Sequence, residues 1–386
     1  MSIIHLSILK ANENELKAIR NLDNTIPEKL ALLFEVDPPS ENVRTRKYMR
    51  ASESPIMTYI DRKIAEISNH WFKQPAMIDG FRWEHDARVE NGEHVIPYMV
   101  SRLVAGGNLV TPVVGYDRWG SIEYKIGLKN ISKAHIHGWC LRLDATAIED
   151  SAEPEFFQEN IRDIVDELGI DPRQCRVILD FADVSLTTNS VSDIFEKSCR
   201  VIRQLTGFCF DYYSVCGCSL PSSIEKAVEK KDTNGSVLRK EMLVYQMLRS
   251  EFPYGVIKSG DYGVRGPTTT EHQSKHINGK IRYTTELNFF VVRGHSIQQD
   301  GGTFAQMHGL AENLVGSEHF LGENFSWGDK NIVSCSKREK LKGKAKPGNA
   351  GTWVGFDTNH HLTFVVQEIE EFERKLKVRE LVGSEP

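Results

Sequence analysis

Short apolar runs recur along the chain, and most of them end in a charged or polar residue. The clearest is RVILDFADV at residues 176–184, in which Asp180 and Asp183 follow the apolar residues. A continuous apolar run of this length is typical of a strand that is buried on both faces. Runs of the same form occupy residues 3–9, 30–36, 76–81, 109–116, 138–144, 212–220 and 255–262. The chain therefore contains eight candidate strands.

Segments with helical spacing lie between most of these runs. Residues 54–72 carry Ile56, Ile60, Ile64 and Ile67 on one stripe, as in an amphipathic helix. Similar segments span residues 154–168, 191–206 and 238–252. Eight strands that alternate with helices predict an α/β fold, a TIM-like (β/α)8 barrel. An open doubly wound sheet is disfavoured because no GxGxxG follows the first run.

The pattern changes after residue 265. Residues 281–293 indicate an antiparallel or additional strand, and residues 305–315 indicate a short helix. Residues 351–367 are interpreted as a strand that leads into a last helix at 368–378. We therefore divide the chain into a barrel at 1–265 and a C-terminal α+β elaboration at 266–386, packed on or over the barrel mouth.

Composition narrows the class of protein. The 386 residues are 40% hydrophobic, enough for a substantial core, and the net charge of -5 excludes a generally basic nucleic-acid-binding protein. The seven cysteines are an odd count spread over apolar segments, which favours reduced thiols. The N-terminus lacks a signal-peptide pattern, and no apolar stretch reaches the ~18 residues of a membrane span. These features predict a cytoplasmic protein that does not contact a membrane.

Ionisable residues stand at the ends of the predicted strands. In a parallel barrel these ends meet on one face, so residues far apart in sequence converge there. The last polar positions of the runs are Lys10, Glu35, Asp79, Tyr116, Arg142, Asp144, Asp180, Asp183, Ser219 and Asp261. The ring as a whole favours a ligand-binding or catalytic site. The pairs Lys10–Glu35 and Arg142–Asp180 can equally be structural ion pairs that close the rim.

Three chemistries fit this ring. Carboxylates such as Glu35 and Asp180 can hold Mg²⁺ while Lys10 and Arg142 bind a phosphate. Two carboxylates can instead act as acid and base in glycoside or N-glycoside cleavage. Lys10 can form a Schiff base, but no Gly/Ser phosphate-binding loop follows the last two strands, so this chemistry ranks lowest. The cofactor stays open, with Mg²⁺ as the candidate.

A second group of aromatic and polar residues lies in the C-terminal part. It comprises FSWGD at 325–329, Trp353 and NHH at 359–361. These residues can cap the barrel mouth or stack on a base or sugar, or they can pack as an accessory layer. If the NHH segment is a strand, only one of His360 and His361 faces the mouth. The basic run at 337–346 can contact phosphates, although lysine-rich loops are usually only solvated.

Several motifs can be compared with a known family: ILK, LLFEV, RLD, ILDFAD and GDYG, followed by RYT, VVRGH, FSWGDKNI and TNHHLTFVV. Together they resemble the bacterial and phage Beta protein family over nearly the whole chain. The resemblance implies a TIM-like barrel with a C-terminal elaboration, and a setting in phages, prophages or mobile defence loci, but no reaction. The residues at matching positions are Lys10, Glu35, Arg142, Asp180, Asp261, Arg282, Tyr283, Arg293, Trp327, Asp329 and His360.

Two hypotheses follow. The leading one is a phage- or prophage-associated enzyme in phage–host conflict, an antiviral defence role, that acts at the barrel mouth on a phosphate-bearing substrate such as a nucleotide or nucleic acid. It would be a hydrolase of phosphodiesterase or glycosidase type. Lys10 and Arg142 would clamp the anion, and Glu35 and Asp180 would be acid, base or metal ligands. Tyr116, Asp261 and the matching C-terminal residues would bind substrate. The alternative is a non-catalytic recognition protein that binds a phage component or a partner subunit; an oligomer is compatible with both.

Overall fold

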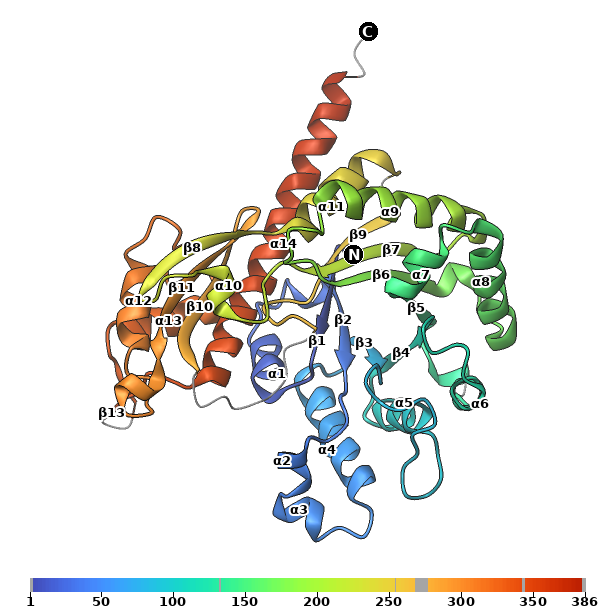
Figure 1. Ribbon diagram of the computed structural model, residues 1–386, viewed down its shortest axis with the longest axis horizontal. Helices are drawn as coiled ribbons and strands as arrows, with labels where there is room; N and C mark the ends of the chain where they lie inside the picture. The colour runs from blue at the N-terminus through green and yellow to red at the C-terminus, as the bar shows by residue number, and fades with distance from the viewer. Residues whose placement is uncertain (1–2, 132, 254, 268–276, 342–343, 384–386) are drawn as a thin grey trace.

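A closed barrel of eight parallel strands forms the centre of the protein (Figure 1). The computed structural model describes residues 3–131, 133–253, 255–267, 277–341 and 344–383. The barrel strands follow one another in the order β1 (His5–Leu9), β2 (Leu30–Glu35), β3 (Pro75–Asp79), β4 (Leu109–Gly115), β5 (Trp139–Leu143), β6 (Cys175–Asp183), β7 (Tyr212–Cys218) and β9 (Ile257–Asp261). The predicted TIM-like (β/α)8 barrel with C-terminal α+β elements is confirmed.

Helices follow most of the barrel strands and cover the outside of the barrel. In chain order they are α1 (Glu13–Arg20), α2 (Glu41–Arg44), α3 (Lys47–Arg50), α4 (Pro55–His70), α5 (Val95–Ala105), α6 (Ile122–Lys129), α7 (Ala145–Asp150), α8 (Pro154–Leu168), α9 (Val191–Leu205), α10 (Ile224–Ala227) and α11 (Lys240–Glu251). The isoleucine stripe predicted for residues 54–72 lies on α4, where Ile60, Ile64 and Ile67 are buried.

Burial on both faces explains why the strands are continuous apolar runs. All six residues of β2 are buried. Leu33 packs inside the barrel with Ile8 and Ile178, whereas its neighbours Leu32 and Phe34 belong to the core under the helices. Since successive side chains of a strand point to opposite faces, each strand supplies one residue to each core in turn.

An antiparallel sheet of three strands, in the order β10-β11-β8, builds the C-terminal layer. The strands are β8 (Thr233–Leu238), β10 (Asn278–Thr285) and β11 (Asn288–Ser296). The interpretation of residues 281–293 as one strand is wrong, because the chain turns at Glu286–Leu287 and Leu287 adopts a positive φ of 54°. The sequence interpretation also missed β8, which precedes residue 265 yet pairs with β11. The helices α12 (Met307–Val315) and α13 (Trp327–Ser336) belong to this layer. Within the basic run, the short strands β12 (Lys340–Leu341) and β13 (Lys344–Ala345) pair with each other.

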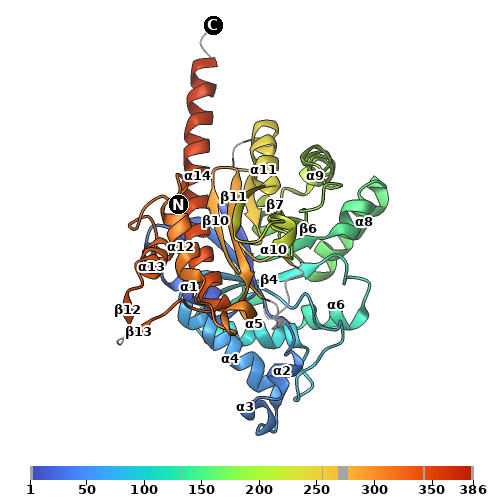
Figure 2. The same cartoon turned by 60° about the vertical axis from the view of Figure 1, so that its left-hand side comes forward.

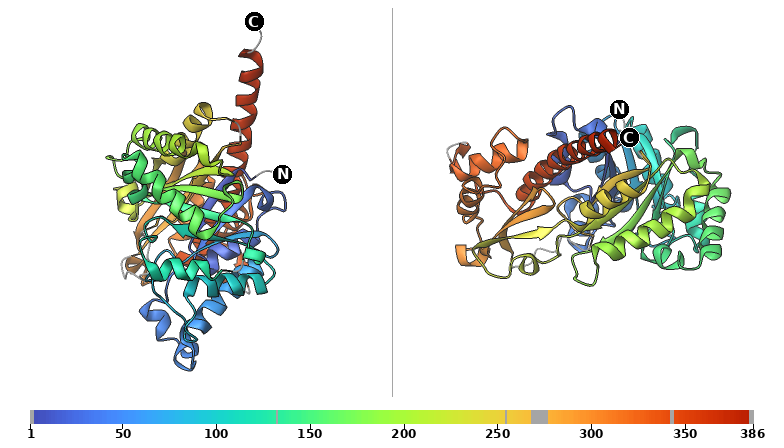
Figure 3. Two further views of the ribbon diagram at one scale, coloured as in Figure 1. Left: turned by 90° about the vertical axis from the view of Figure 1, so that its right-hand side faces the viewer. Right: turned by 90° about the horizontal axis from the view of Figure 1, so that it is seen from above.

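The long helix α14 (Ala350–Gly383) corrects the interpretation of residues 351–367 as a strand. Nearly every residue from Asp357 to Val366 is buried, because this half of the helix lies among α1, α13 and β10. A helix that is covered on several sides has no polar face, so its sequence lacks the amphipathic period. Figures 1 and 3 show the C-terminal end of α14 extending beyond the rest of the molecule.

The C-terminal layer lies at one end of the molecule and α8 at the other (Figure 3). Figure 2 shows β10 and β11 beside α14. This position puts the layer against the seam where β9 meets β1, and the seam pairs His5 with Ser259 and Ser7 with Asp261. No helix among the described residues is both long and apolar enough to cross a membrane.

Candidate functional site

Arg142 occupies the centre of the barrel mouth. It lies near the end of β5, and its guanidinium contacts three carboxylates that come from three other strands. Nη1 donates to Asp79 at 2.8 Å, while Nε and Nη2 both donate to Asp180, at 2.8 and 2.6 Å. Nη2 also lies 2.8 Å from Oε1 of Glu35. The side chain is 1% exposed, so a permanent positive charge is buried here with compensating negative charges on three sides.

Two more cations complete the network. Lys10, directly after β1, donates to Glu35 at the end of β2. Arg118, in the loop after β4, donates to Asp79 through Nη1 at 2.8 Å. The mouth therefore holds Lys10, Arg118 and Arg142 against Glu35, Asp79 and Asp180, and all six side chains are buried. Three positive and three negative charges give this network no net charge.

Neighbouring charges favour the ionised form of Asp79. Burial raises the pKa of Asp79, but the charges of Arg118 and Arg142 outweigh it and hold that pKa below its usual range. Tyr262, which follows β9, donates its hydroxyl to Asp180 and accepts from Nη2 of Arg142 at 2.8 Å. Burial raises the pKa of Tyr262 far above its usual value, so it stays a neutral donor.

One oxygen of the network lacks a donor. Nη2 of Arg142 gives its two hydrogens to Asp180 and Tyr262, and Oε1 of Glu35, although close to Nη2, accepts no hydrogen bond within the described chain. A buried carboxylate oxygen without a donor is costly. Charge attraction to Arg142 holds this oxygen, and its hydrogen-bonding capacity is left for a ligand.

The backbone around the mouth is strained at two positions. Ala11, directly after Lys10, has a φ of 49°, and Ala182, close behind Asp180, has a φ of 52°. Alanine adopts this left-handed region at a cost, and such strain is concentrated at functional sites. The Asp180 carboxylate stabilises the turn because Oδ1 accepts the Ala182 N–H at 2.9 Å. Phe81, after β3, covers the site, with its ring centre 4.2 Å from the Arg142 guanidinium.

Four polar residues of the predicted ring make hydrogen bonds outside this network. Tyr116 donates to Asp150 at 2.9 Å, and Asp144 caps α7 by accepting the Ala147 N–H. Asp183 accepts the Ser185 N–H. Ser219 donates to Glu241 of α11. The structure therefore brings together Lys10, Glu35, Asp79, Arg142 and Asp180, and not these four residues.

Asp261 faces away from the mouth, because its neighbour Tyr262 faces into it and successive side chains of a strand alternate. Its carboxylate lies on the outer side of the β1–β9 seam. There Oδ2 is 2.8 Å from Nε2 of His361 on α14, and Oδ1 accepts from Ser7 at 3.0 Å. Nε2 of His5 lies 3.4 Å from the same Oδ1. The first and last barrel strands are thus joined to the C-terminal helix through a polar cluster.

The FSWGD and NHH motifs form a second buried polar cluster, inside the C-terminal layer. Asp329 accepts from Tyr283 at 2.7 Å and lies 2.9 Å from Nδ1 of His360. The rings of Tyr283 and His360 stack with their centres 3.7 Å apart. Because the NHH segment is helical, its two histidines diverge: His360 contacts Asp329, and His361 contacts Asp261.

The other matching C-terminal residues also lie in this layer. Arg282 donates to Asp357 at 2.9 Å and to the carbonyl of Val264. Arg293 donates to the carbonyl of Val228 and to Glu225. Trp327 begins α13 and packs edge-on against Phe356. These contacts join strands and helices of the layer.

Sequence reasoning missed Arg118, Tyr262 and Phe81. Arg118 lies in the loop beyond β4, outside the strand-end rule that selected the ring. Phe81 ends the predicted run 76–81, but the rule selected polar residues and took Asp79. Tyr262 was within a predicted strand, but the charged Asp261 beside it was chosen instead. The alternation of side chains along a strand was the signal that would have favoured Tyr262.

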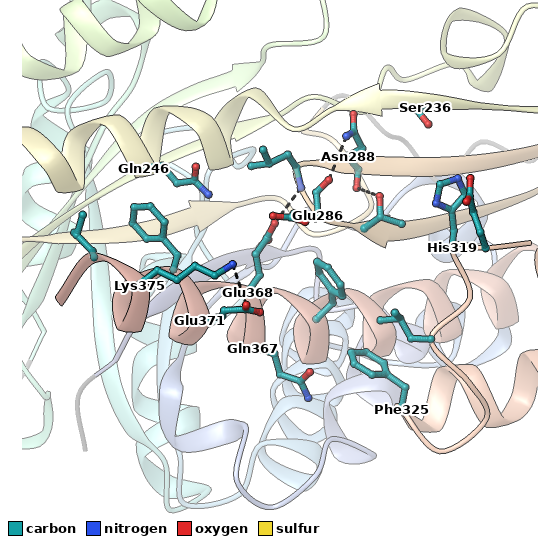
Figure 4. A pocket seen from close by; sticks show the side chains of 17 residues that line it. Ser236, Gln246, Glu286, Asn288, His319, Phe325, Gln367, Glu368, Glu371 and Lys375 are labelled. Atoms are coloured by element: carbon teal, nitrogen blue, oxygen red, sulfur yellow. Dashed lines mark hydrogen bonds and ion pairs between the residues drawn. The ribbon is translucent and has the colours of Figure 1, made fainter. Parts of the chain in front are cut away.

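A groove of about 740 Å³ opens between α14, α11 and the β10–β11 turn (Figure 4). Phe325, Phe364 and Phe372 supply its apolar surface, and Glu318 and Glu371 lie among its acidic residues. Glu371 pairs with Lys375 at 2.9 Å. The groove is therefore aromatic and mainly acidic, whereas the basic run lies outside its lining.

The fold and the mouth define this chain as a TIM-like barrel protein with a buried, charge-balanced network at the C-terminal ends of its strands and a C-terminal α+β layer at the β1–β9 seam. It belongs to the Beta protein family, whose sequence model matches residues 6–367. A comparison with curated proteins finds no match.

Proposed function

We propose that this protein is a cytoplasmic barrel enzyme of phage–host conflict that binds a phosphate-bearing substrate, a nucleotide or nucleic acid, at the barrel mouth and hydrolyses it. The proposal rests on one observation. Six charged side chains, each from a different barrel strand or from the loop that follows it, converge at the barrel end where TIM-barrel active sites lie. The phage or prophage setting rests on the resemblance of the motifs to the bacterial and phage family.

Energetics support a functional rather than a purely structural network. Replacing buried ion pairs with apolar residues of similar volume is often neutral or stabilising, by roughly 1–4 kcal/mol. Stability alone would therefore not favour three cations and three carboxylates over an apolar plug. The left-handed Ala11 and Ala182 add a further cost at the same place.

The residues suit different roles in such a reaction. Lys10 and Arg142 would contact the phosphate, which competes with the carboxylates for their N–H groups. Glu35, whose Oε1 lacks a donor, would accept a proton from the attacking water. Asp180 would hold Arg142 in place. Mg²⁺ does not fit this site, because the guanidinium of Arg142 already lies among the three carboxylates that would bind the ion.

Ligand binding by the full chain tests this proposal. We expect pyrophosphate or a nucleotide to raise the melting temperature of the wild type, and Lys10→Met or Arg142→Met to abolish that rise. The control is Lys125→Met, which removes a lysine of α6 that pairs with Asp163 outside the mouth. A wild type that binds none of a panel of phosphates, nucleotides and oligonucleotides would refute the proposal, as would a Lys10→Met variant that binds as well as the wild type.

The groove of the C-terminal layer supports the second candidate, a non-catalytic recognition protein. Its aromatic and acidic lining suits a cationic, amphipathic peptide segment of a partner. A lysine- and leucine-rich probe peptide should then bind the wild type and the Glu35→Gln/Asp180→Asn variant equally, and should bind Glu318→Lys/Glu371→Lys at least tenfold more weakly. Equal binding to the charge-reversed variant would exclude the groove as the binding surface.

A further inference from the structure

The polar cluster at the β1–β9 seam has the composition of a metal site. His5 begins β1, Asp261 ends β9, and His361 lies in the buried half of α14. One ligand atom from each residue can be chosen so that all three lie within 4.8 Å of one another, and all three residues are buried. Two imidazoles and one carboxylate form a ligand set found in protein zinc sites.

The inner nitrogens of both histidines face the same carboxylate. Nε2 of His361 is 2.8 Å from Oδ2 of Asp261, and Nε2 of His5 is 3.4 Å from Oδ1. The contact of His5 does not meet hydrogen-bond geometry, so this buried nitrogen has no hydrogen-bond partner among the described residues. Buried polar atoms almost always have a partner, so an imidazole nitrogen that faces a carboxylate without a hydrogen bond points to an ion between them.

The outer atoms of the cluster are already anchored. Nδ1 of His5 contacts the hydroxyl of Ser259 at 3.2 Å, and Nδ1 of His361 contacts the hydroxyl of Thr284 at 2.9 Å. Asp261 accepts from Ser7 and from the N–H of Gly263. Histidines that bind metals almost always use the second ring nitrogen in this way, and ligating carboxylates are themselves hydrogen-bonded. The outer contacts orient three ligand atoms toward one point.

The two contacts to Asp261 are close to the spacing of a zinc site. Metal–ligand bonds of 2.0–2.1 Å in a tetrahedral zinc site place neighbouring ligand atoms about 3.3 Å apart. The His5 separation of 3.4 Å, which runs to Oδ1 of Asp261, already agrees with this value. The His361 separation of 2.8 Å runs to Oδ2 of the same carboxylate and must widen by about half an ångström. The three ligand atoms together lie within 4.8 Å of one another, so the side chains must close on the ion as it binds.

We propose that His5, Asp261 and His361 bind a divalent late transition-metal ion, with Zn²⁺ as the best match, and that this ion fastens α14 to the seam between the first and last barrel strands. The site is separate from the network of Arg142, because Asp261 points outward where Tyr262 points inward. The ion would join three elements that the chain places far apart in sequence, with its fourth coordination position left to water or to the second carboxylate oxygen of Asp261.

Metal content of the full chain is the first test. Protein purified and then incubated with Zn²⁺ should retain close to one equivalent after desalting, and Co²⁺ should give the strong visible absorption bands of a tetrahedral site. Removing the metal with a chelator should lower the melting temperature by a few degrees, and added Zn²⁺ should restore it. A wild type that retains no zinc and gives no Co²⁺ bands would overturn the proposal.

Variants identify the ligands. His5→Gln and His361→Gln should each lose the bound metal, whereas His295→Gln should keep it. His295 is a matched control because it also contacts two carboxylates, those of Asp232 and Asp300, but lies in β11 away from the seam. Zinc that is retained by both ligand variants, or lost in His295→Gln, would also overturn the proposal. If a ligand variant fails to fold, the wild-type Co²⁺ spectrum and the chelator experiment still decide the question.

Discussion

Arg142 offers the sharpest test of the buried network, through the variant Arg142→Met. The methionine keeps most of the length of the side chain but removes the charge. Lys10 still faces Glu35 and Arg118 still faces Asp79, so the uncompensated charge falls on Asp180. Breaking a buried pair by removing one partner costs roughly 3–5 kcal/mol. We expect the free energy of unfolding to fall by that amount at pH 8.

A second substitution should recover much of this loss. In Arg142→Met/Asp180→Leu the remaining pairs are again neutral, because an apolar side chain replaces the carboxylate that has lost its cation. We expect the double variant to be more stable than Arg142→Met by about 2 kcal/mol, because apolar replacement of both partners is much less costly than removal of one. Additive losses are instead expected if the two side chains do not interact.

The loss of stability in Arg142→Met should depend on pH. In Arg142→Met the uncompensated Asp180 should bind a proton more readily in the folded than in the unfolded state, so the loss should shrink as the pH falls from 8 to 5.5. In the wild type, the lowered pKa of Asp79 gives stability that is lost only when the pH falls through the acidic range, below about 4. Subtracting the unfolding free energy of the wild type from that of the variant at each pH cancels the contributions of the other titratable groups.

Urea unfolding followed by tryptophan fluorescence measures these quantities, since the chain has six tryptophans. A loss below about 1 kcal/mol for Arg142→Met at pH 8 would contradict the reasoning, because that is the range of an exposed ion pair. So would a double variant no more stable than the single one.

Three further predictions concern other sites. Burial raises the pKa of Glu241 from 4.5 to about 7, so its contribution to wild-type stability should fall by about 2–3 kcal/mol between pH 5 and pH 8. Glu241→Gln should lack this contribution, so the difference in unfolding free energy between variant and wild type, measured by urea unfolding, should change by that amount over the range. A constant difference would exclude Glu241 as the source. In Gly328→Ala a Cβ would lie 2.3 Å from the carbonyl oxygen of Phe356. This contact forces α13 and α14 apart and should lower the free energy of unfolding by roughly 1–3 kcal/mol. The control is Gly309→Ala in α12, whose Cβ meets nothing within 4 Å and which should be neutral or stabilising by up to about 1 kcal/mol. In Gly115→Ala a Cβ would lie 2.1 Å from Nη2 of Arg118, so the free energy of unfolding should fall by about 1–3 kcal/mol. Because the clash is with the guanidinium, Gly115→Ala/Arg118→Met should be no less stable than Arg118→Met alone.

The barrel could be predicted because its strands are buried on both faces and therefore leave short apolar runs that helices separate. The strand-end rule then located Lys10, Glu35, Asp79, Arg142 and Asp180, since the ends of parallel strands meet on one face. It failed for Asp261 because the position of a residue at a strand end does not fix its face. The proposed reaction remains a prediction.

The C-terminal layer was harder to predict for physical reasons. Half of α14 is buried among other elements, so its apolar residues follow no single stripe. The turn between β10 and β11 places Leu287 in a left-handed conformation that glycine or asparagine normally occupies. The sequence therefore carries no turn signal there, and β8 pairs with a strand that is distant in sequence.

The contact of Asn359 with α1 has a consequence for the order in which the chain folds. Its amide donates to the carbonyl of Ala18 at 2.9 Å across 341 residues of sequence. A ribosome that has made α1 must therefore make α14 before this face of α1 can be covered. Contacts of such long range slow folding, because the loop must close before they stabilise anything. The barrel strands can all pair once residue 261 has been made, whereas the docking of α14 on α1 should consequently be a late event in biosynthesis.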